Sequence, residues 1–315
     1  MPQSTPFLSR RHALFAGAAV PLAAAAASLP HAARAGAAMT GPAFPRYHRT
    51  RLGGFEVTTL LAGSRPLDEP QSTFGMNVSP EEFAEVSEAN FIPSDRSLNF
   101  FTPTLVNTGA ELVLFDTGLD ADGILSAIEA AGHRAAEVDV VVLTHMHGDH
   151  IGGLMQAGSP TFENARYVTG AVEHNHWASA GNEGFENNVR PLEEQMTFLS
   201  GGEDVVSGIT AIETFGHSPG HMAYMLESEG EQLVLIADTA NHYVWSLAHP
   251  DWEVRFDMDK AAAAATRREI LGMIAADRIP FVGYHMPFPA RGFVEARDDG
   301  FRYVPATYQG MFGEG

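Results

Sequence analysis

Hydrophobic and polar positions along the chain follow patterns that predict strands and a helix in its first half. Residues 54–63 alternate between apolar and polar side chains, as a half-buried strand does. Residues 102–118 predict two strands joined by a turn at residues 107–109. Residues 120–132 have a helical period with an acidic start and a glycine stop. The continuous apolar run within residues 138–145 is typical of a buried strand.

The second half repeats this order of elements. It predicts a strand, a hairpin, a helix, a further strand and a C-terminal hairpin at residues 209–217, 222–239, 259–278, 279–286 and 292–305. Because a hairpin, a helix and a buried strand occur twice, we expect an α/β fold of four layers, with two mixed sheets packed face to face and helices outside. Residues 64–100 hold several prolines and scattered aromatic residues, which predict a long irregular excursion with short helical turns.

The first 35 residues have the pattern of a targeting segment. Two arginines at residues 10–11 precede an alanine-rich apolar stretch, and residues 33–35 form an A-x-A cleavage pattern. A membrane anchor is the alternative, but Pro21 breaks the stretch, which is short for a span of about 20 residues. Paired arginines favour the twin-arginine export route and therefore the periplasm. The expected organisation is a signal peptide, an extended arm and a single domain at residues 1–35, 36–46 and 47–315.

The composition limits the partners that the protein can bind. Of 315 residues, 39 are acidic and 19 are basic, so the formal net charge at pH 7 is −20. Such a surface repels phosphate backbones and anionic lipids, which argues against nucleic acid partners and stable membrane association and suits small neutral or cationic substrates. The chain has no cysteine, so a metal would be bound through nitrogen and oxygen atoms. The composition leaves a homodimer open.

Three histidines and an aspartate crowd the end of the predicted buried strand. His145 and His147 are two residues apart, so both rings can face one point. Gly148 frees the backbone to bring Asp149 and His150 to the same place. A solvent-exposed polar loop is the alternative, but three more ligand-type residues each end a predicted strand: His217, Asp238 and His285. Together these side chains could hold two neighbouring cations.

Several short motifs resemble those of the metallo-β-lactamase superfamily. "THMHGDHIGG" matches its H-x-H-x-D-H motif, "FGHSPGH" its G-H-[ST]-P-G-H segment, and "LVLFDTG" a landmark upstream of the first motif. "IADT" and "GYHM" are similar to the segments that carry its bridging aspartate and last histidine. The motifs stand in family order over roughly residues 50–308. The resemblance implies an αβ/βα sandwich with the metals at one edge.

By position, the resemblance assigns each ligand-type residue to one of two divalent metals. The first metal would have the ligands His145, His147 and His217. The second would have Asp149, His150 and His285, and Asp238 would bridge the two. His221, the second histidine of "GHSPGH", would lie beneath the site. Zinc suits this set of nitrogen and oxygen ligands, with manganese, cobalt or iron as alternatives.

Two such metals predict a hydrolase. A water that bridges two divalent cations has its pKa lowered from about 15.7 towards about 7, which supplies hydroxide at neutral pH. Asp149 and Asp238 would fix this nucleophile and accept its proton. We therefore expect an exported dinuclear metal-dependent hydrolase that acts on a small ester, lactone or organophosphate triester. The alternative is a relative of the same fold that binds a metal or ligand without turnover.

Within the superfamily, the chain is most similar to the methyl parathion hydrolase group, whose members hydrolyse phosphotriesters, lactones and aryl esters. The shared features are an export signal, an opening strand, "THMHGDHIGG" and a C-terminal "GFRYVP" hairpin. One departure concerns acyl-homoserine lactonases, which carry a tyrosine three residues after the bridging aspartate. This chain has Asn241 at that position.

Four residues are candidates for contact with the substrate. Trp177 and Phe185 belong to a segment that is expected to overhang the metals. His242 and Tyr243 follow the bridging aspartate and could replace the missing tyrosine. Aromatic side chains are more often part of a core, which is the alternative for each of them.

Overall fold

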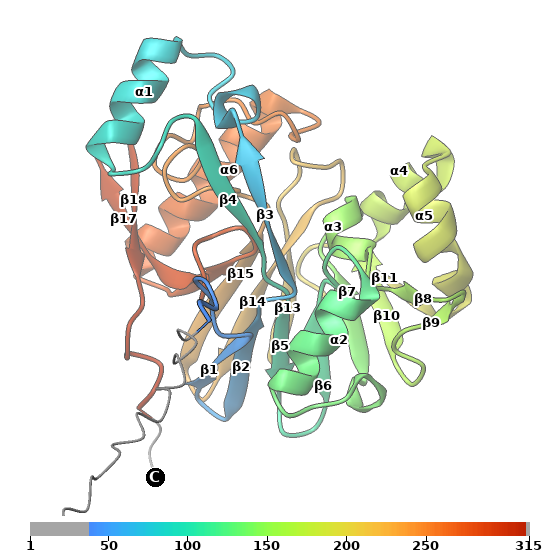
Figure 1. Ribbon diagram of the computed structural model, residues 1–315. Coiled ribbons are helices and arrows are strands. Elements are labelled where there is room, and N and C mark those ends of the chain that lie inside the picture. Colours follow the sequence, from blue (N-terminus) through green and yellow to red (C-terminus); the bar gives the residue numbers. More distant parts are fainter. Residues whose placement is uncertain (1–37, 313–315) are drawn as a thin grey trace, which may run out of the picture. The chain divides into compact units, whose positions relative to one another are not determined.

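The computed structural model describes residues 38–312, and its largest elements are two seven-stranded mixed sheets (Figure 1). In the first sheet the strands lie in the order β1 (Tyr47–Leu52), β2 (Phe55–Leu60), β5 (Thr104–Asn107), β6 (Leu112–Phe115), β7 (Val140–Leu143), β10 (Arg166–Gly170) and β11 (Met196–Leu199). In the second sheet the order is β12 (Asp204–Val206), β13 (Ile209–Glu213), β14 (Met222–Ser228), β15 (Glu231–Ala237), β16 (Phe281–Gly283), β17 (Arg291–Arg297) and β18 (Gly300–Pro305). A small ribbon pairs β8 (Met155–Gln156) with β9 (Ser159–Pro160).

Strand β7 shows how the sequence builds the layers. Successive strand residues point to opposite faces of a sheet, so a continuous apolar run buries both faces. Val140 and Val142 belong to a hydrophobic cluster that also contains residues of the second sheet. Val141 and Leu143 belong to another cluster, which contains Ile124 of helix α2 (Ala121–Ala130). The predicted arrangement of two packed sheets with helices outside is therefore confirmed.

Helices cover the outer faces of the sheets. Helices α2, α4 (Ala171–Ala180) and α5 (Glu183–Asn188) contribute to the cluster on the first sheet, and α6 (Lys260–Asp277) packs Leu271 against the second. Asp259 caps the start of α6 by accepting from the N–H of Ala262, and the helix ends before Pro280 as the sequence predicts. Shorter helical segments are α3 (Gly148–Ile151), η1 (Pro70–Ser72), η2 (Ala135–Glu137) and η3 (Arg190–Gln195).

The prediction that residues 64–100 are irregular is wrong. This excursion contains an antiparallel ribbon of β3 (Gly63–Asp68) and β4 (Arg96–Phe101), with the ten-residue helix α1 (Pro80–Ala89) between them. Its prolines occupy tolerated positions: Pro66 lies in a two-stranded ribbon, and Pro80 begins α1 after the capping residue Ser79. Phe83 of α1 packs against Trp245 in a third hydrophobic cluster. The excursion is therefore an ordered part of the fold.

The segments expected at the N-terminus are described only in part. The predicted signal peptide, residues 1–35, lies outside the described residues, as do residues 36 and 37 of the predicted arm. Residues 38–45 contain no helix or strand, and a compact unit begins at Ala43. In the part of the chain that the structure describes, no helix is both long enough and apolar enough to cross a membrane.

Candidate metal centre

The predicted metal ligands lie just beyond the ends of strands, in loops and in the short helix α3. They are His145 and His147 after β7, Asp149 and His150 in α3, His217 between β13 and β14, Asp238 directly after β15, and His285 after β16. Strands β13 and β15 each pair antiparallel with β14, and β16 is parallel to β15. Strands β13, β15 and β16 therefore run in the same direction, and their carboxyl ends lie at the same edge of the sheet.

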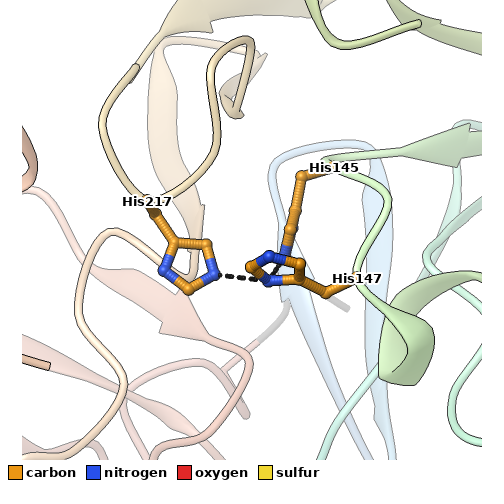
Figure 2. A group of neighbouring side chains, drawn as sticks. All are labelled: His145, His147 and His217. Atoms are coloured by element: carbon orange, nitrogen blue, oxygen red, sulfur yellow. Dashed lines mark hydrogen bonds between the residues drawn. The ribbon is translucent and has the colours of Figure 1, made fainter. Parts of the chain in front are cut away.

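Three imidazole rings converge in what we call the three-histidine group, which consists of His145, His147 and His217 (Figure 2). The Nδ1 atom of His147 lies 3.0 Å from the Nε2 atom of His145 and 3.0 Å from the Nε2 atom of His217. His145 and His217 are buried, whereas His147 is half-buried. The structure thus brings together the three nitrogen ligands that the sequence assigns to one metal.

Hydrogen bonds on the far side of two rings show where the lone pairs lie. Nδ1 of His217 is 2.9 Å from a carboxylate oxygen of Asp257, which accepts, so Nδ1 carries the proton and Nε2 a lone pair. The Thr144 hydroxyl donates to a carboxylate and therefore accepts from Nδ1 of His145, which leaves a lone pair on Nε2. Both lone pairs point at one nitrogen of His147. A single proton on Nδ1 of His147 can bond to only one of these two Nε2 atoms, whereas a cation can bind all three nitrogens.

The other cluster, which we call the mixed group, consists of Asp149, His150 and His285. Nε2 of His285 lies 3.3 Å from Oδ2 of Asp149, and Nε2 of His150 lies 3.7 Å from the same oxygen. His285 donates through Nδ1 to the main-chain oxygen of Phe100 at 2.7 Å, and His150 through Nδ1 to Asp116 at 2.8 Å. These far-side bonds turn both Nε2 atoms towards the carboxylate.

Asp238 contacts both groups. Its Oδ2 atom lies 3.3 Å from Nε2 of His217 and 3.2 Å from Nε2 of His285, and its Oδ1 atom lies 3.3 Å from Nε2 of His150. Oδ1 of Asp238 and Nε2 of His150 are buried and lie 3.3 Å apart, but among the described residues neither has a partner with hydrogen-bond geometry. Because buried polar atoms are seldom left unsatisfied, these residues fit two cations that share the Asp238 carboxylate.

Burial and charge act differently on the two groups. Burial, with the neighbouring His217, lowers the pKa of His147 to about 3. Burial also opposes the charged form of His285, but the carboxylates of Asp238 and Asp149 outweigh it and raise the pKa of His285 to about 10. Burial opposes the charged form of Asp149 as well, yet His150 and His285 lower the pKa of this carboxyl to about 2. Burial therefore favours the neutral form of His147, whereas the mixed group attracts positive charge.

Two glycines let helices pack closely against the loop of His217. Gly216 has a φ of +128°, and a Cβ there would lie 2.3 Å from the main-chain nitrogen of Ala263 in α6. A Cβ on Gly220 would lie 2.1 Å from the main-chain nitrogen of Glu173 in α4. Glycine is needed on both sides of His217 because a side chain would push one of these helices away.

Sequence reasoning missed buried residues that hold the ligands. Asp257 accepts from His217 and, through its other carboxylate oxygen, from Nη2 of Arg267 at 2.8 Å. Arg267 is 1% exposed and also donates to the main-chain oxygen of Thr239, next to Asp238. Nothing in the sequence separates Asp257 or Arg267 from surface residues. Asp116, by contrast, belongs to the "LVLFDTG" landmark that the sequence shows.

His221 and Asn241 contact Asp238 from two sides. Nε2 of His221 accepts from the main-chain N–H of Asp238 at 3.1 Å, and Nδ1 lies 2.7 Å from the Thr214 hydroxyl, so both ring nitrogens are used. Asn241, which stands where related lactonases are expected to have tyrosine, donates through Nδ2 to Oδ2 of Asp238 at 2.8 Å. Asn241 therefore fixes the carboxylate of Asp238, and His221 fixes the main chain that carries it.

Two cavities flank the β3–β4 ribbon beside the ligands. One, of about 530 Å³, is lined by metal-ligand candidates, including Asp149, and by Phe101 of β4. The other, of about 410 Å³, is lined by Phe100 of β4 and by His242 and Tyr243, two of the predicted substrate residues. Successive residues of β4 point to opposite faces of the ribbon, which explains this division. His285 lines both cavities.

Trp177 and Phe185 line neither cavity. Phe185 is fully buried in the hydrophobic cluster on the first sheet, so the prediction that it contacts the substrate is wrong. Trp177 packs edge-on against His147 with ring centres 5.8 Å apart, and its indole N–H donates to Glu173. The aromatic composition of this segment suggested a pocket. It does not show which faces of α4 and α5 turn inward, so it could not distinguish a substrate contact from a core position.

Known proteins resemble this chain in sequence over part of its length. The family model of the metallo-beta-lactamase superfamily matches residues 102–280. An N-acyl homoserine lactonase from Bacillus cereus is 26% identical over 135 residues, 43% of this chain and 51% of the relative. The probable metallo-hydrolase YybB from Bacillus subtilis (strain 168) is 31% identical over 129 residues, 38% of this chain and 53% of the relative. The chain thus spans about half the length of these curated relatives.

Solved structures extend the resemblance to the whole fold. AidC, a dizinc quorum-quenching lactonase in complex with a product, has a TM-score of 0.77 at 24% identity, covering 84% of this chain and 98% of AidC. The hydrolase AbOPH of the beta lactamase superfamily has a TM-score of 0.78 at 23% identity, covering 85% of this chain and 100% of AbOPH. At this level of identity the likeness shows the fold, an αβ/βα sandwich.

Proposed function

Because this chain belongs to the metallo-beta-lactamase superfamily, we propose that it is a metal-dependent hydrolase with a dinuclear centre that acts on a small ester, lactone or organophosphate triester. One observation carries the proposal. Asp238 lies between the two ligand groups, and its Oδ1 atom and Nε2 of His150 are buried without a hydrogen-bond partner among the described residues. Such a cluster is costly to bury unless cations compensate it.

Zinc is the proposed metal, with manganese, cobalt or iron as alternatives. Imidazole nitrogen and carboxylate oxygen are ligands that all four metals accept. The fold of AidC, which is described as a dizinc lactonase, supports zinc. When bound, two divalent cations would lower the pKa of a water molecule and polarise the C=O or P=O bond of the substrate.

The chain's own residues would orient the reacting groups. Asp149 is half-buried and lines the larger cavity, so its carboxylate can accept the proton that an attacking water loses. Oδ2 of Asp238 lies near His217 and His285, one from each group, and Asn241 holds this oxygen, while Oδ1 lies near His150. Leu67 and Phe101 of the β3–β4 ribbon would exclude water from part of the cavity, whose ribbon side also carries Arg65 and Asn99.

Esters, lactones and phosphotriesters share a neutral, polarised oxygen, and the cavity suits such substrates. Leu67, Phe74 and Phe101 give its wall an apolar surface for a substituent. The curated N-acyl homoserine lactonase from Bacillus cereus supports the lactone class in particular. The acidic surface of the chain supports a neutral substrate over an anionic polymer.

Metal analysis with a substrate panel tests the proposal. Protein expressed in metal-supplemented medium should contain about two metals per chain and hydrolyse at least one of an aryl ester, a lactone and a phosphotriester. Chelation should abolish turnover, and added metal should restore it. Two bound metals without turnover of any class would instead favour a relative that binds metal or ligand only. Protein that contains no metal and stays inactive after metal addition would overturn the proposal.

We also propose that residues 1–35 are a twin-arginine signal and that the mature protein is periplasmic. The paired arginines and the A-x-A pattern support it. Replacing Arg10 and Arg11 with lysine should stop export, which fractionation and the N-terminal sequence of the exported protein will show. Normal processing and export of this variant would contradict the twin-arginine route.

A further inference from the structure

We propose that Glu173 is a positioning residue that holds the three-histidine group in its metal-binding geometry. The proposal rests on the metal assignment made above. Glu173 lies in the first turn of α4 and is fully buried, although no motif of the sequence includes it. A buried carboxylate needs strong partners, so its contacts show its role.

Four donors converge on the Glu173 carboxylate. Oε1 accepts from the main-chain N–H of Met146 at 3.0 Å and from the indole N–H of Trp177 at 2.7 Å. Oε2 accepts from the Ser218 hydroxyl at 2.7 Å and from the main-chain N–H of Gly220 at 2.8 Å. Each oxygen accepts two donors, which fills the hydrogen-bonding capacity of a carboxylate.

These donors come from the two loops that carry the three-histidine group. Met146 lies between His145 and His147, whereas Ser218 and Gly220 follow His217. One carboxylate therefore ties the loop after β7 to the loop between β13 and β14. Asp149 and His150 follow the same loop in α3, but Tyr284 holds the main-chain oxygen of Asp149 and Asp116 holds His150. Of the ligands, the four donors adjoin His145, His147 and His217, so the effect of Glu173 should be concentrated on one side of the centre.

The three-histidine group needs such a support because none of its members is a carboxylate. Its rings meet at Nδ1 of His147, which lies 3.0 Å from Nε2 of His145 and of His217, and a proton on that nitrogen can serve only one of the two contacts. The scaffold must hold the rings in place before a cation binds. Glu173 also acts on His147 through Trp177, whose ring packs edge-on against that histidine. Glu173 thus fixes all three rings through main-chain and packing contacts.

Glu173→Gln is the sharpest change because it keeps the shape of the side chain. Glutamine replaces one acceptor oxygen with an NH2 donor, which would face either Met146 and Trp177 or Ser218 and Gly220. In the first orientation Met146 and Trp177 lose their acceptor; in the second Gly220 loses its acceptor, although the Ser218 hydroxyl can accept from the NH2 group. Mutation of residues that support metal ligands typically lowers metal affinity about 10–100-fold, and we expect a loss in that range at the three-histidine group alone.

The experiment measures the two sites separately. Wild type, Glu173→Gln and Glu193→Gln are loaded with ¹¹³Cd²⁺ for NMR, and chelator competition gives the affinity of each site. A His285→Ala variant, which lacks a mixed-group ligand, assigns the resonances. Glu193 is the matched control, because this acid on η3 pairs with Arg190 and lies outside the centre. We expect Glu173→Gln to weaken one site about 10–100-fold and to leave the other within about twofold, whereas Glu193→Gln changes neither.

Equal weakening of both sites, or none, in Glu173→Gln would overturn the proposal. A purely structural role would weaken both sites alike, so the selectivity is the decisive result. If Glu173→Gln does not fold, Ser218→Ala and Trp177→Phe each remove one of the four donors. Each should weaken the same single site by a smaller factor, and two unchanged sites in both variants would overturn the proposal as well. A wild type that binds no Cd²⁺ would contradict the metal assignment itself.

Discussion

The two ligand groups of the centre differ in charge and in how the chain holds them. In the three-histidine group, burial lowers the pKa values of His145 and His147, and the supports come from outside, from Glu173 in α4 and from Asp257 with Arg267. In the mixed group, carboxylates and imidazoles shift each other's pKa values towards the charged forms. One group is therefore held by its scaffold, and the other is held partly by its own charges.

Because the two groups are held differently, we expect the two metals to respond to different mutations. Changes in the scaffold should weaken the three-histidine group, none of whose members is a carboxylate that could attract the others. Changes in charge should weaken the mixed group. Asp238 belongs to neither group and contacts both, so it is the residue whose loss should abolish the distinction.

The largest effect is expected for Asp238→Asn. The substitution keeps the shape of the side chain but removes the negative charge that faces both groups, so both metals should bind more weakly. Misplacing a nucleophile by about 1 Å can cost about 10²-fold, and metal loss adds to this. Turnover of the substrate identified in the panel should fall by at least about 10²-fold, while circular dichroism shows an intact fold.

His174→Ala is the control for this variant, because His174 pairs with Glu193 outside the centre. It should leave the metal content unchanged. Near-normal turnover of Asp238→Asn with both metals bound would remove Asp238 from the mechanism and with it the shared carboxylate on which the dinuclear assignment depends.

An intermediate effect is expected for Asp257→Asn, which should separate the two groups. Burial alone would raise the pKa of Asp257, but the hydrogen bond with His217 and the Arg267 charge outweigh burial and lower this pKa below its ordinary value. The carboxylate is therefore ionised and accepts from both residues. Asparagine offers one acceptor oxygen for these two donors. The affinity of the three-histidine group should fall about 10–100-fold, measured by chelator competition, and that of the mixed group should stay nearly constant.

A neighbouring ion pair provides the matched control for this variant, because its arginine also lies on α6. Arg268, next to Arg267, pairs with Asp251 at an exposed position. Exposed ion pairs contribute little, so Asp251→Asn should change neither affinity. Equal losses at both groups in Asp257→Asn would show that the buried pair supports the fold in general and not the three-histidine group.

The contrast between ligands and supports also explains what the sequence could predict. The central strands of the two sheets, with α2 and α6, follow from periodicity, whereas strands β1, β10, β11 and β12 were not predicted. His145, His147, Asp149 and His150 form a dense cluster that the sequence shows directly. Their roles as ligands stay predictions. Glu173, Asp257 and Arg267 carry no comparable signal, because their partners come from distant parts of the chain.

The β3–β4 ribbon escaped prediction for a local reason. Its prolines suggest irregular structure, yet Pro66 lies in a two-stranded ribbon and Pro80 at the first position of a helix, where a missing N–H is tolerated. The prediction for Phe185 failed for another reason, because composition does not show whether an aromatic ring faces a pocket or the core. Tertiary contacts decided both cases.

The smallest effect is expected for Tyr284→Phe, which should act on the mixed group alone. The Tyr284 hydroxyl donates to the main-chain oxygen of Asp149 at 2.5 Å, and its ring packs against His150 with ring centres 4.0 Å apart. Phenylalanine keeps the ring and removes one hydrogen bond, worth about 0.5–1.5 kcal/mol. The mixed group should therefore lose about tenfold or less in metal affinity, and the three-histidine group should lose nothing.

Tyr224 provides the matched control for this prediction, because its buried hydroxyl has no hydrogen-bond partner among the described residues. Tyr224→Phe also removes one hydroxyl from the interior, but no bond to a ligand loop is lost, so both affinities should remain at wild-type values. An equal change in the two variants would mean that loss of a buried hydroxyl, not loss of the Asp149 contact, alters the centre. A change confined to Tyr284→Phe and to the mixed group would show that even a single main-chain contact acts on one metal and not on the other.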